Sequence, residues 1–520
     1  MVCGTASDVG KSAVVAGLCR LLARRGVRVA PFKAQNMALN SYVTPSGHEI
    51  GRAQGVQALA AGAEPEVAMN PILLKPTGER TSQVVVLGRP WAHLDAAGYH
   101  RAKPQLLELV LGCLAGLRSR FDVVVCEGAG SPAEVNLLDH DIVNLRVAAE
   151  SGLPAVVVGD IDRGGVFAAL YGTLALLPDS YRRLVKGFVI NKFRGDPELL
   201  DPGLTELERR CGVPALGVLP WVEGLGLDAE DSLALAGTRP TAGSPPPDGS
   251  DGVDVAAIQL PRMANATDLD ALAIEPGVGV RLVTSAGSLG DPDVIVVPGT
   301  KATVADLGWL RARGLDAALA AAARRRSGPV VLGVCGGYEM LGRTIVDFVE
   351  SGQGHVPGLG LLDVDTRFAP DKVTRQRRGR GLGRRLAGYE IRHGRPEHGP
   401  TARPWVELDD LYGAEAEGAA TGPVPDGTRG ALPSVIGTSL HGLFEEDGFR
   451  AAFLAAAARR RGKRFVPAGV SFTAAREAQL DRFADLLEAH VDLPALEAIM
   501  ATAACAREAA AEASAVGGVP

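Results

Sequence analysis

Short apolar segments typical of buried strands recur along this chain and alternate with longer stretches of helical periodicity. The segments at 122–128, 154–160 and 186–193 lie before residue 237, and the same alternation starts again after residue 252. Continuously apolar strands separated by helices are typical of parallel sheets that helices cover on both faces. The sequence therefore predicts two α/β domains in tandem.

A segment of small and turn-forming residues separates the two runs. Twelve of the sixteen residues at 237–252 are Gly, Pro, Ser or Thr, so they predict a linker that cannot form a core. The predicted domains are therefore 1–236 and 253–450. Residues 451–506 are expected to form a helical extension packed on the second domain, and residues 507–520 a flexible tail rich in Ala and Gly.

Charge, hydropathy and cysteine usage exclude several classes of protein. The 520 residues carry a formal charge of −6, whereas a general nucleic-acid binder needs a broad basic face. No apolar run approaches the ~20 residues of a membrane span, and the N-terminal residues lack the pattern of a signal peptide. The seven cysteines form no CxxC pair, so neither a zinc site nor a disulfide framework is indicated, and a reducing cytoplasm fits best.

Residues 4–12, GTASDVGKS, form a variant of the phosphate-binding P-loop. The first glycine lies one position earlier than usual, but small residues still let successive backbone N–H groups turn toward phosphate oxygens. Lys11 would offer a cation to the β- and γ-phosphates, and Ser12 a hydroxyl to Mg²⁺. We therefore expect ATP and Mg²⁺ to bind here, with the nucleotide held by Asp8, Gly10, Lys11 and Ser12.

Acidic residues at other strand ends are candidate metal ligands. Glu127 follows the strand DVVVC and begins a glycine turn, which is where a Mg²⁺ ligand belongs in a parallel sheet. A helix-capping acid is the alternative. Asp160 and Asp162 follow another strand in the same way. The predicted metal ligands are Ser12 and Glu127.

Two more strand ends carry polar groups suited to a substrate or a nucleotide. Lys33 and Asn36 follow the strand VRVAPF and could hold a substrate carboxylate or the phosphoryl group in transfer, or could lie in a solvated loop. Asn191 and Lys192 follow GFVI and could contact the adenine edge. We add Lys33 and Asn191 to the predicted nucleotide-binding residues.

The second domain contains an apolar strand that leads directly into a cysteine and two glycines. In GPVVLGVCGGYEMLG, Cys335 is followed by Gly336 and a helix, an arrangement similar to the nucleophile elbow with Cys in place of Ser. A helix N-terminus favours the thiolate, and the N–H of Gly336 could bind an oxyanion. A second donor could come from Gly299 or Thr300. A buried structural cysteine is the alternative.

A thiol nucleophile needs a base. His441 lies in VIGTSLHGLFEE, just after an apolar strand, so it can project from the strand end. The other histidines of the second domain lie in glycine- or proline-rich loops or on the polar face of a late helix. A core or capping histidine is the alternative reading of His441.

Together these motifs resemble the cobyric acid synthase family, the glutamine-dependent amidotransferases of cobalamin biosynthesis. In the first domain the resemblance rests on GTASDVGKS, FKAQNMALNS, MNPILLKP, EGAGSPAEVN, VVVGDIDRGGVF and GFVINKFRGD. In the second it rests on VVPGTKATVADLGWLR, GVCGGYEMLG, GYEI and SLHGLFE. It implies a P-loop, dethiobiotin synthetase-like parallel-sheet domain followed by a class I glutamine amidotransferase-like α/β domain.

The resemblance assigns Cys335 as the glutaminase nucleophile and His441 as its base. Class I glutaminases usually place Glu two residues after the histidine, where this chain has Leu443, so the resemblance implies a dyad with Glu445 as a candidate orienter. The family often has His directly after GYEI. This chain has Arg392 and then His393, so their roles stay open.

The implied reaction is ATP-dependent amidation of the b, d, e and g carboxylates of adenosylcobyrinic acid a,c-diamide. Glutamine, hydrolysed through a thioester, would supply ammonia, and ATP would activate each carboxylate as an acyl phosphate. The implied partners are glutamine, ATP and a corrinoid polycarboxylate. The alternatives are the sister family, the cobyrinic acid a,c-diamide synthases, and a deviant-P-loop ATPase switch, which would have no use for the second domain.

The segment 372–385 is basic and rich in glycine, which predicts a surface excursion. It is either a solvated loop or a means of steering an anionic corrinoid toward a net negative protein. Its cations are Lys372, Arg375, Arg377, Arg378, Arg380, Arg384 and Arg385.

Overall fold

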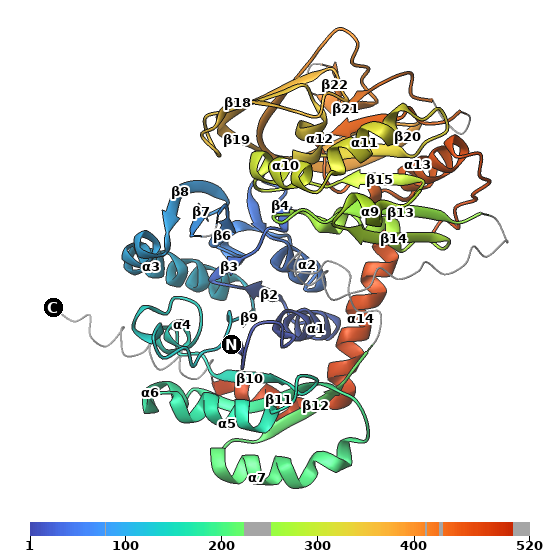
Figure 1. The fold of residues 1–520 in the computed structure, drawn as a ribbon. Helices are drawn as coiled ribbons and strands as arrows, with labels where there is room; N and C mark the ends of the chain where they lie inside the picture. The colour runs from blue at the N-terminus through green and yellow to red at the C-terminus, as the bar shows by residue number, and fades with distance from the viewer. Residues whose placement is uncertain (79, 223–250, 411–412, 426–429, 503–520) are drawn as a thin grey trace.

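The computed structural model describes residues 1–78, 80–222, 251–410, 413–425 and 430–502. Two α/β domains lie one above the other in Figure 1, the first in blue to green and the second in green to orange. Most of the predicted linker at 237–252, and all of the predicted tail at 507–520, lie outside the described residues.

The first domain is built on a parallel sheet. A parallel bridge between Val2 and Glu127 joins its two hydrogen-bonded parts into one layer. In spatial order its strands are β2 (Val29–Phe32), β9 (Val123–Cys126), β1 (Val2–Gly4), β10 (Ala155–Asp160), β11 (Val185–Phe193) and β12 (Ala215–Pro220). All of these pairings are parallel, as the apolar runs predicted.

Helices cover both faces of this sheet, which explains why its strands are apolar throughout. Val157 of β10 packs with α3, α4 and α5 on one face, while Val156 and Val158 pack with α1 on the other. The helices are α1 (Lys11–Arg24), α2 (Arg52–Ala60), α3 (Ala96–Arg120), α4 (Leu145–Glu150), α5 (Val166–Leu176), α6 (Asp179–Arg182) and α7 (Asp201–Cys211).

An insertion between β2 and β9 carries smaller strands and reaches the second domain. Its β4 contacts β19 and β20 of that domain. The strands of the insertion are β3 (Gln35–Met37), β4 (Ser41–Val43), β5 (Glu49–Gly51), β6 (Ile72–Pro76), β7 (Thr81–Val86) and β8 (Arg89–Asp95).

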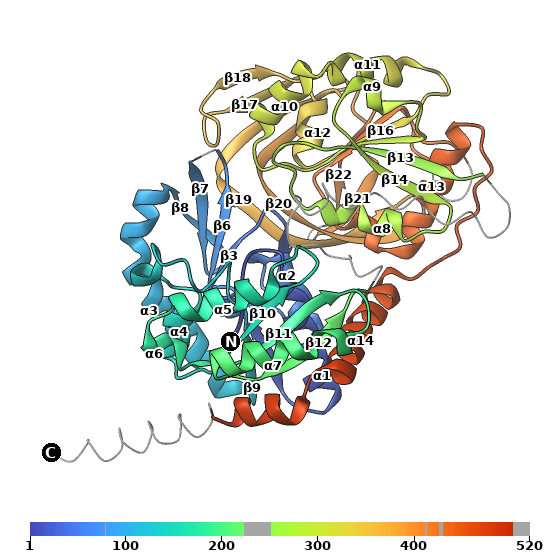
Figure 2. The same ribbon diagram turned by 60° about the horizontal axis from the view of Figure 1, so that its bottom comes forward.

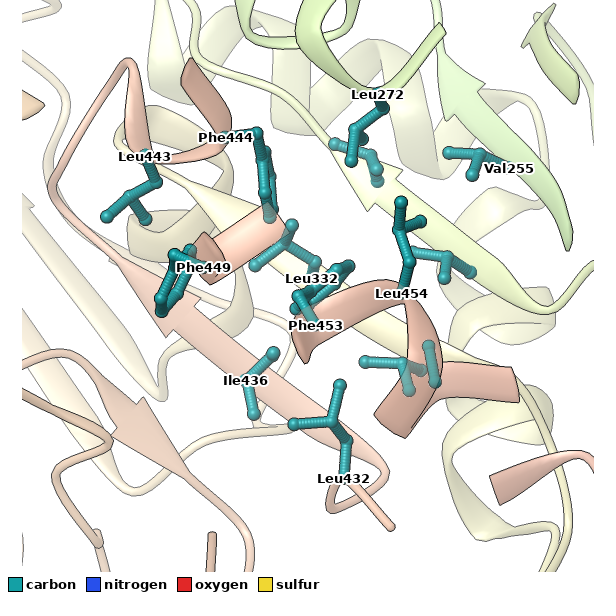
Figure 3. Packing of buried hydrophobic residues seen from close by; sticks show 14 of the residues in the cluster. Val255, Leu272, Leu332, Leu432, Ile436, Leu443, Phe444, Phe449, Phe453 and Leu454 are labelled. Carbon is teal, nitrogen blue, oxygen red and sulfur yellow. The ribbon is translucent and has the colours of Figure 1, made fainter. Parts of the chain in front are cut away.

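The second domain has a parallel sheet with one antiparallel edge strand. In spatial order its strands are β14 (Val278–Val283), β13 (Val253–Ile258), β15 (Val294–Val297), β16 (Val330–Val334), β24 (Val435–Thr438) and the antiparallel β23 (Ala419–Ala420). Its helices are α8 (Asp270–Ala273), α9 (Ala286–Leu289), α10 (Thr303–Ala312), α11 (Leu315–Arg324), α12 (Gly336–Leu341) and α13 (Asp447–Arg460). Figure 3 shows one face of its core, where Leu332 and Ile436 of the sheet lie near Phe449, Phe453 and Leu454 of α13.

A second sheet in this domain contains the basic segment 372–385, which is therefore not a loop. Its strands are β17 (Thr344–Asp347), β18 (Gly354–Pro357), β19 (Val364–Gly381), β20 (Arg384–His398), β21 (Val406–Asp410) and β22 (Gly413–Glu417). The basic segment forms the end of the β19–β20 hairpin. Lys372 is buried against Glu49 of the first domain, and Arg377 against Glu390, because cross-strand and interdomain carboxylates neutralise them. The exposed cations are Arg375, Arg378, Arg380, Arg384 and Arg385.

The expectation that residues 451–506 pack on the second domain is wrong for most of α14 (Phe472–His490). This helix leaves the second domain and lies along α1 of the first (Figures 1 and 2). Leu480, Ala484 and Leu487 of α14 are buried in the same hydrophobic cluster as α1. Acidic residues of α14 also pair with Arg20 and Arg24 of α1 and with Arg25 directly after it, so charge and apolar packing both favour this position. Leu493 and Leu496, which follow α14, are buried in the same cluster. Of α13 and α14, only α13 stays in the core of the second domain.

Candidate active sites

The P-loop connects β1 to α1 through a turn that only glycine can make. Gly10 precedes α1 with φ 97°, in the left-handed region that L side chains rarely adopt. A Cβ atom here would also lie 2.2 Å from Nδ2 of Asn191. That amide donates to the carbonyl of Val9 at 2.9 Å, so Asn191 supports the loop. Its expected contact with adenine stays a prediction.

The ammonium group of Lys11 lies between the P-loop and the glycine turn after β9. Its Nζ donates to the carbonyls of Ala6 at 2.7 Å and Gly130 at 3.2 Å, and the residue is only 7% exposed. Asp8 is exposed and has φ 59°, and it lines the same cavity as Lys11. Its binding of nucleotide also stays a prediction.

Glu127 is the buried centre of a polar cluster beside the P-loop. Its Oε1 accepts from Ser12 Oγ at 2.8 Å and from Lys33 Nζ at 2.9 Å, and its Oε2 accepts from Gln57 at 2.6 Å. Mg²⁺ prefers oxygen ligands and usually combines one or two carboxylates with phosphate oxygens and water. A hydroxyl and a carboxylate in contact at the P-loop therefore fit a nucleotide-bound Mg²⁺.

The two other acidic candidates have basic partners. Asp160 accepts from Lys192 Nζ at 2.8 Å, and Asp162 from Arg194 at 3.0 Å. Lys192 also donates to the carbonyl of Asp8 at 2.7 Å, so it links Asp160 to the P-loop. These pairs stabilise the loop region, and neither aspartate lines the cavity described next.

A cavity of about 380 Å³ opens beside the P-loop. Lys11, Lys33 and Asn36 line it, together with Lys103 of α3. Burial lowers the pKa of Lys103. The sequence alone does not single out Lys103 as a site residue, because lysines on long helices are usually exposed to solvent. Three ammonium groups around one cavity can bind phosphates and a substrate carboxylate together.

The thiol of the second domain lies at a strained turn between β16 and α12. Cys335 has φ 49° and ψ −112°, an unusual conformation for a residue other than glycine. Gly337 comes so close to β15 that a Cβ atom would lie 1.9 Å from the carbonyl oxygen of Val297. The glycines of GVCGG are therefore needed for the close approach that holds Cys335 at the end of its strand.

Cys335, His441 and Asp268 form a buried array. The Nδ1 atom of His441 lies 2.6 Å from Oδ2 of Asp268, and His441 and Cys335 line the same small cavity. The Sγ atom of Cys335 donates to the carbonyl of Ile391 at 3.7 Å. Burial alone would lower the pKa of His441, but the Asp268 carboxylate and the Cys335 thiol outweigh it and raise this pKa to about 10. The predicted pair is thus extended by a carboxylate that orients the imidazole, as in other nucleophile–base–acid sites.

Asp268 was missed by the sequence analysis, and Glu445 does not take the place expected of it. Asp268 ends the short helix η5 (Ala266–Asp268), 173 positions before His441, and belongs to no motif. Glu445 instead accepts from Arg52 of the first domain at 2.7 Å and from Arg476 of α14 at 3.0 Å. The orienting acid therefore comes from a distant loop, because the chain after His441 turns toward the domain interface.

The expected oxyanion donors surround the same thiol. A Cβ atom on Gly299 would lie 2.7 Å from Cε1 of His441, and one on Gly336 would lie 2.8 Å from Cγ2 of Thr300. Gly299, Gly336 and Thr300 are thus within contact distance of the array. Their binding of an oxyanion stays a prediction.

The backbone of His441 is fixed by β20. Tyr389 and His441 exchange two backbone hydrogen bonds of 2.9 Å, and their rings stack with centroids 5.5 Å apart. Tyr389 belongs to the GYEI motif, so this motif supports the histidine directly. Beyond it, Arg392 donates to Glu390 at 2.6 Å, and His393 contacts the carbonyl of Ala369 at 3.0 Å.

A small cavity of about 40 Å³ lies beside Cys335 at the interface of the two domains. Lys75 of the first domain contributes to its wall. The second domain contributes charged and polar groups that suit a zwitterionic ligand, namely Lys301, Glu339, Glu350, Lys372, Arg392 and His393. Burial raises the pKa of Glu339 to about 8 and lowers that of His393 to about 4.

No cluster of three or more His, Cys, Asp or Glu side chains suited to hold a metal ion occurs among the described residues. Within the same part of the chain, no helix combines the length and the hydropathy needed to cross a membrane.

Comparison with known proteins accounts for both domains. Residues 1–234 match the CobQ/CobB/MinD/ParA nucleotide binding domain, and residues 254–449 match the CobB/CobQ-like glutamine amidotransferase domain. The chain is 53% identical to the cobyric acid synthase of Frankia casuarinae and 54% identical to that of Nocardia farcinica, with 96% of both chains covered in each case. The expected α/β class, with a P-loop domain followed by an amidotransferase domain, is confirmed. With this identity along nearly the whole of both sequences, the chain belongs to the cobyric acid synthase family.

Proposed function

We propose that this chain is a glutamine-hydrolysing ligase that amidates the b, d, e and g carboxylates of adenosylcobyrinic acid a,c-diamide to give adenosylcobyric acid. One observation carries the proposal: a single chain of this family combines a P-loop site with a buried Cys335–His441–Asp268 array. The first site suits carboxylate activation by ATP, and the second suits the release of ammonia from glutamine.

In the glutaminase reaction, the sulfur of Cys335 attacks the side-chain amide carbon of glutamine. Asp268 holds His441 with the other ring nitrogen toward the thiol, and His441 carries the thiol proton to the departing ammonia. The N–H groups of Gly299 and Gly336 are our candidates to stabilise the oxyanion. Water then attacks the thioester, His441 accepts its proton, and glutamate leaves.

In the synthetase reaction, the triphosphate of ATP lies along the P-loop, with Lys11 beside the β- and γ-phosphates. Bound Mg²⁺, held by Ser12 and Glu127, would neutralise the phosphate charge. The substrate carboxylate lies near Lys33 and Lys103 in the 380 Å³ cavity and attacks the γ-phosphorus, which forms an acyl phosphate and ADP. Ammonia then displaces phosphate and leaves an amide.

We place this reaction in the cytoplasm, with small-molecule substrates and without nucleic acid or a membrane as partners. Each of the six cysteines in the described residues is free, which fits a reducing compartment. The net charge of −6 argues against a nucleic-acid partner, because such a partner needs a broad basic face.

The test is an assay with purified protein, ATP, Mg²⁺, glutamine and adenosylcobyrinic acid a,c-diamide. Each exchange of OH for NH₂ lowers the mass by about one unit, so we expect four successive losses by mass spectrometry. Inert a,c-diamide together with two losses from cobyrinic acid would instead identify a diamide synthase. ATP hydrolysis without any mass change in either corrinoid would favour the ATPase switch.

A further inference from the structure

The loop that carries Asp268 is held by the first domain. Asn40 Oδ1 accepts from the backbone N–H of Ala266 at 3.1 Å, and Asn265 Oδ1 accepts from the backbone N–H of Ser41 at 2.8 Å. Each asparagine therefore caps a backbone donor of the opposite domain. Both are buried, with exposed fractions of 1% for Asn40 and 4% for Asn265, so water does not compete for these bonds.

Three consecutive hydrogen-bonded residues connect this contact to the segment that carries the imidazole of His441, through Asn265, Asp268 and Gly442. Asn265 has φ 54°, and its carbonyl accepts from the backbone N–H of Asp268 at 3.1 Å. Asp268 then contacts His441 through Oδ2 and accepts from the N–H of Gly442 at 2.7 Å through Oδ1. A displacement of Asn265 would therefore move the carboxylate that orients His441.

The segment that follows His441 is held from the same corner of the first domain. It forms η6 (Leu443–Glu445), and Glu445 accepts from the guanidinium of Arg52, a residue only 3% exposed. Arg52 begins α2, and its backbone N–H donates to the carbonyl of Asn40 at 3.1 Å. Asn40 and Arg52 are thus joined to each other and act on the two segments that carry Asp268 and His441.

We propose that Asn40 and Arg52 of the first domain are positioning residues of the glutaminase, which fix Asp268 and His441 in their reactive geometry when the two domains are in contact. Ammonia is then released at the full rate only where the domain that consumes it is docked. This inference rests on the proposed function, because it presupposes that Cys335 and His441 hydrolyse glutamine.

The first test measures glutamate release by Asn40→Ala, Arg52→Met and Asn265→Gly. Glycine at 265 keeps the positive φ but removes the side-chain acceptor, so this variant probes the same contact from the second domain if Asn40→Ala folds poorly. We expect kcat to fall about 10- to 100-fold with little change in KM for glutamine, since a misplaced base slows the chemistry rather than the binding. Ammonium-dependent amidation stays near wild type.

The matched control is Gln376→Ala. Gln376 of β19 donates to the carbonyl of Val43 at 2.8 Å, so it also makes an interdomain hydrogen bond but lies outside the path to Asp268. We expect its glutaminase kcat to equal that of wild type. An equal loss of kcat in Gln376→Ala would overturn the proposal, since any weakened interface would then suffice.

The second test follows alkylation of Cys335 by iodoacetamide against pH, with the modified peptide quantified by mass spectrometry. A displaced Asp268 stabilises the imidazolium less and so leaves less thiolate, and alkylation near neutral pH should be slower in Asn40→Ala and Arg52→Met but not in Gln376→Ala. If Asn40→Ala and Arg52→Met both keep the kcat and the alkylation profile of wild type, the positioning role is wrong. Cys335→Ala separates the two ideas, because glutaminase activity that survives this change contradicts the proposed function itself.

Discussion

The phosphate site and the thiol site share a local design but differ in the origin of their support. Each lies where a buried parallel strand ends and a helix begins, β1 to α1 in one case and β16 to α12 in the other. The contacts described above for Lys11 and Glu127 come from the first domain. The array at Cys335, in contrast, depends on contacts from Asn40 and Arg52 across the interface. The contacts of the ATP site therefore come from its own domain, whereas the glutaminase, in our proposal, is completed by docking.

Loss of the thiol should give the largest effect and separate the two sites fully. Cys335→Ala is expected to abolish glutamine-dependent amidation and leave ammonium-dependent amidation intact, because carboxylate activation needs no thiol. Amide formation is measured with each nitrogen donor. An equal loss with both donors would break the division of labour between the domains.

Loss of the P-loop cation should reverse this pattern. Lys11→Ala removes charge stabilisation of the transferring phosphoryl group, so amidation should fall by about 10²- to 10³-fold with either nitrogen donor. Glutamate release, assayed in parallel, should persist because the array at Cys335 does not contact Lys11. Near wild-type amidation with ammonium would show that this loop does not bind the phosphates.

Loss of the orienting carboxylate should affect only the glutaminase. We expect Asp268→Asn to lower kcat for glutamate release by about 10²-fold, the scale of a positioned acid–base partner, with KM nearly unchanged. Glu445→Gln is the comparison variant, because Glu445 contacts Arg52 and Arg476 rather than His441 and its loss should lower kcat less. If Glu445→Gln proves the more damaging change, Asp268 is not the group that orients His441.

The same aspartate should make stability depend on pH. The pKa of His441 is raised to about 10 in the folded state, against about 6.5 in an unfolded chain. The contribution of protonated His441 to the free energy of unfolding is therefore fully present below about pH 6.5 and is lost as the pH rises toward 10. The unfolding temperatures (Tm) of wild type and Asp268→Asn should differ most at pH 6 and should converge near pH 10. A pH-independent difference would contradict the charged pair.

The smallest effect is expected at the exposed end of the β19–β20 hairpin. Replacement of Arg378, Arg380, Arg384 and Arg385 by Gln should raise the corrinoid KM about two- to threefold at low salt, through weaker electrostatic steering. KM for ATP and glutamine should not change. The measurement is the salt dependence of the corrinoid KM. Identical slopes for the variant and wild type would leave this end as ordinary solvated surface.

Local sequence was enough to predict the two turns at which the chemistry sits. In GTASDVGKS and GVCGG, consecutive residues combine an apolar strand, glycines and a helix start, and backbone geometry converts that order directly into a phosphate loop and a thiol at a strand end. The apolar runs likewise predicted the parallel sheets, because a strand buried on both faces must be apolar at every position.

Contacts between distant segments could not be predicted in this way. Asp268 belongs to no motif and meets His441 only because β13 and β24 run parallel in one sheet and end at the same edge of it. The polar side chains of α2, Arg52 and Gln57 among them, resemble a solvated face, yet they are buried against Glu445 and Glu127. Lys372 and Arg377 are buried, and α14 packs on the first domain, because their partners also lie far away in the sequence. A charge is buried or exposed according to the partner that packing brings to it, and that partner lies far away in the chain.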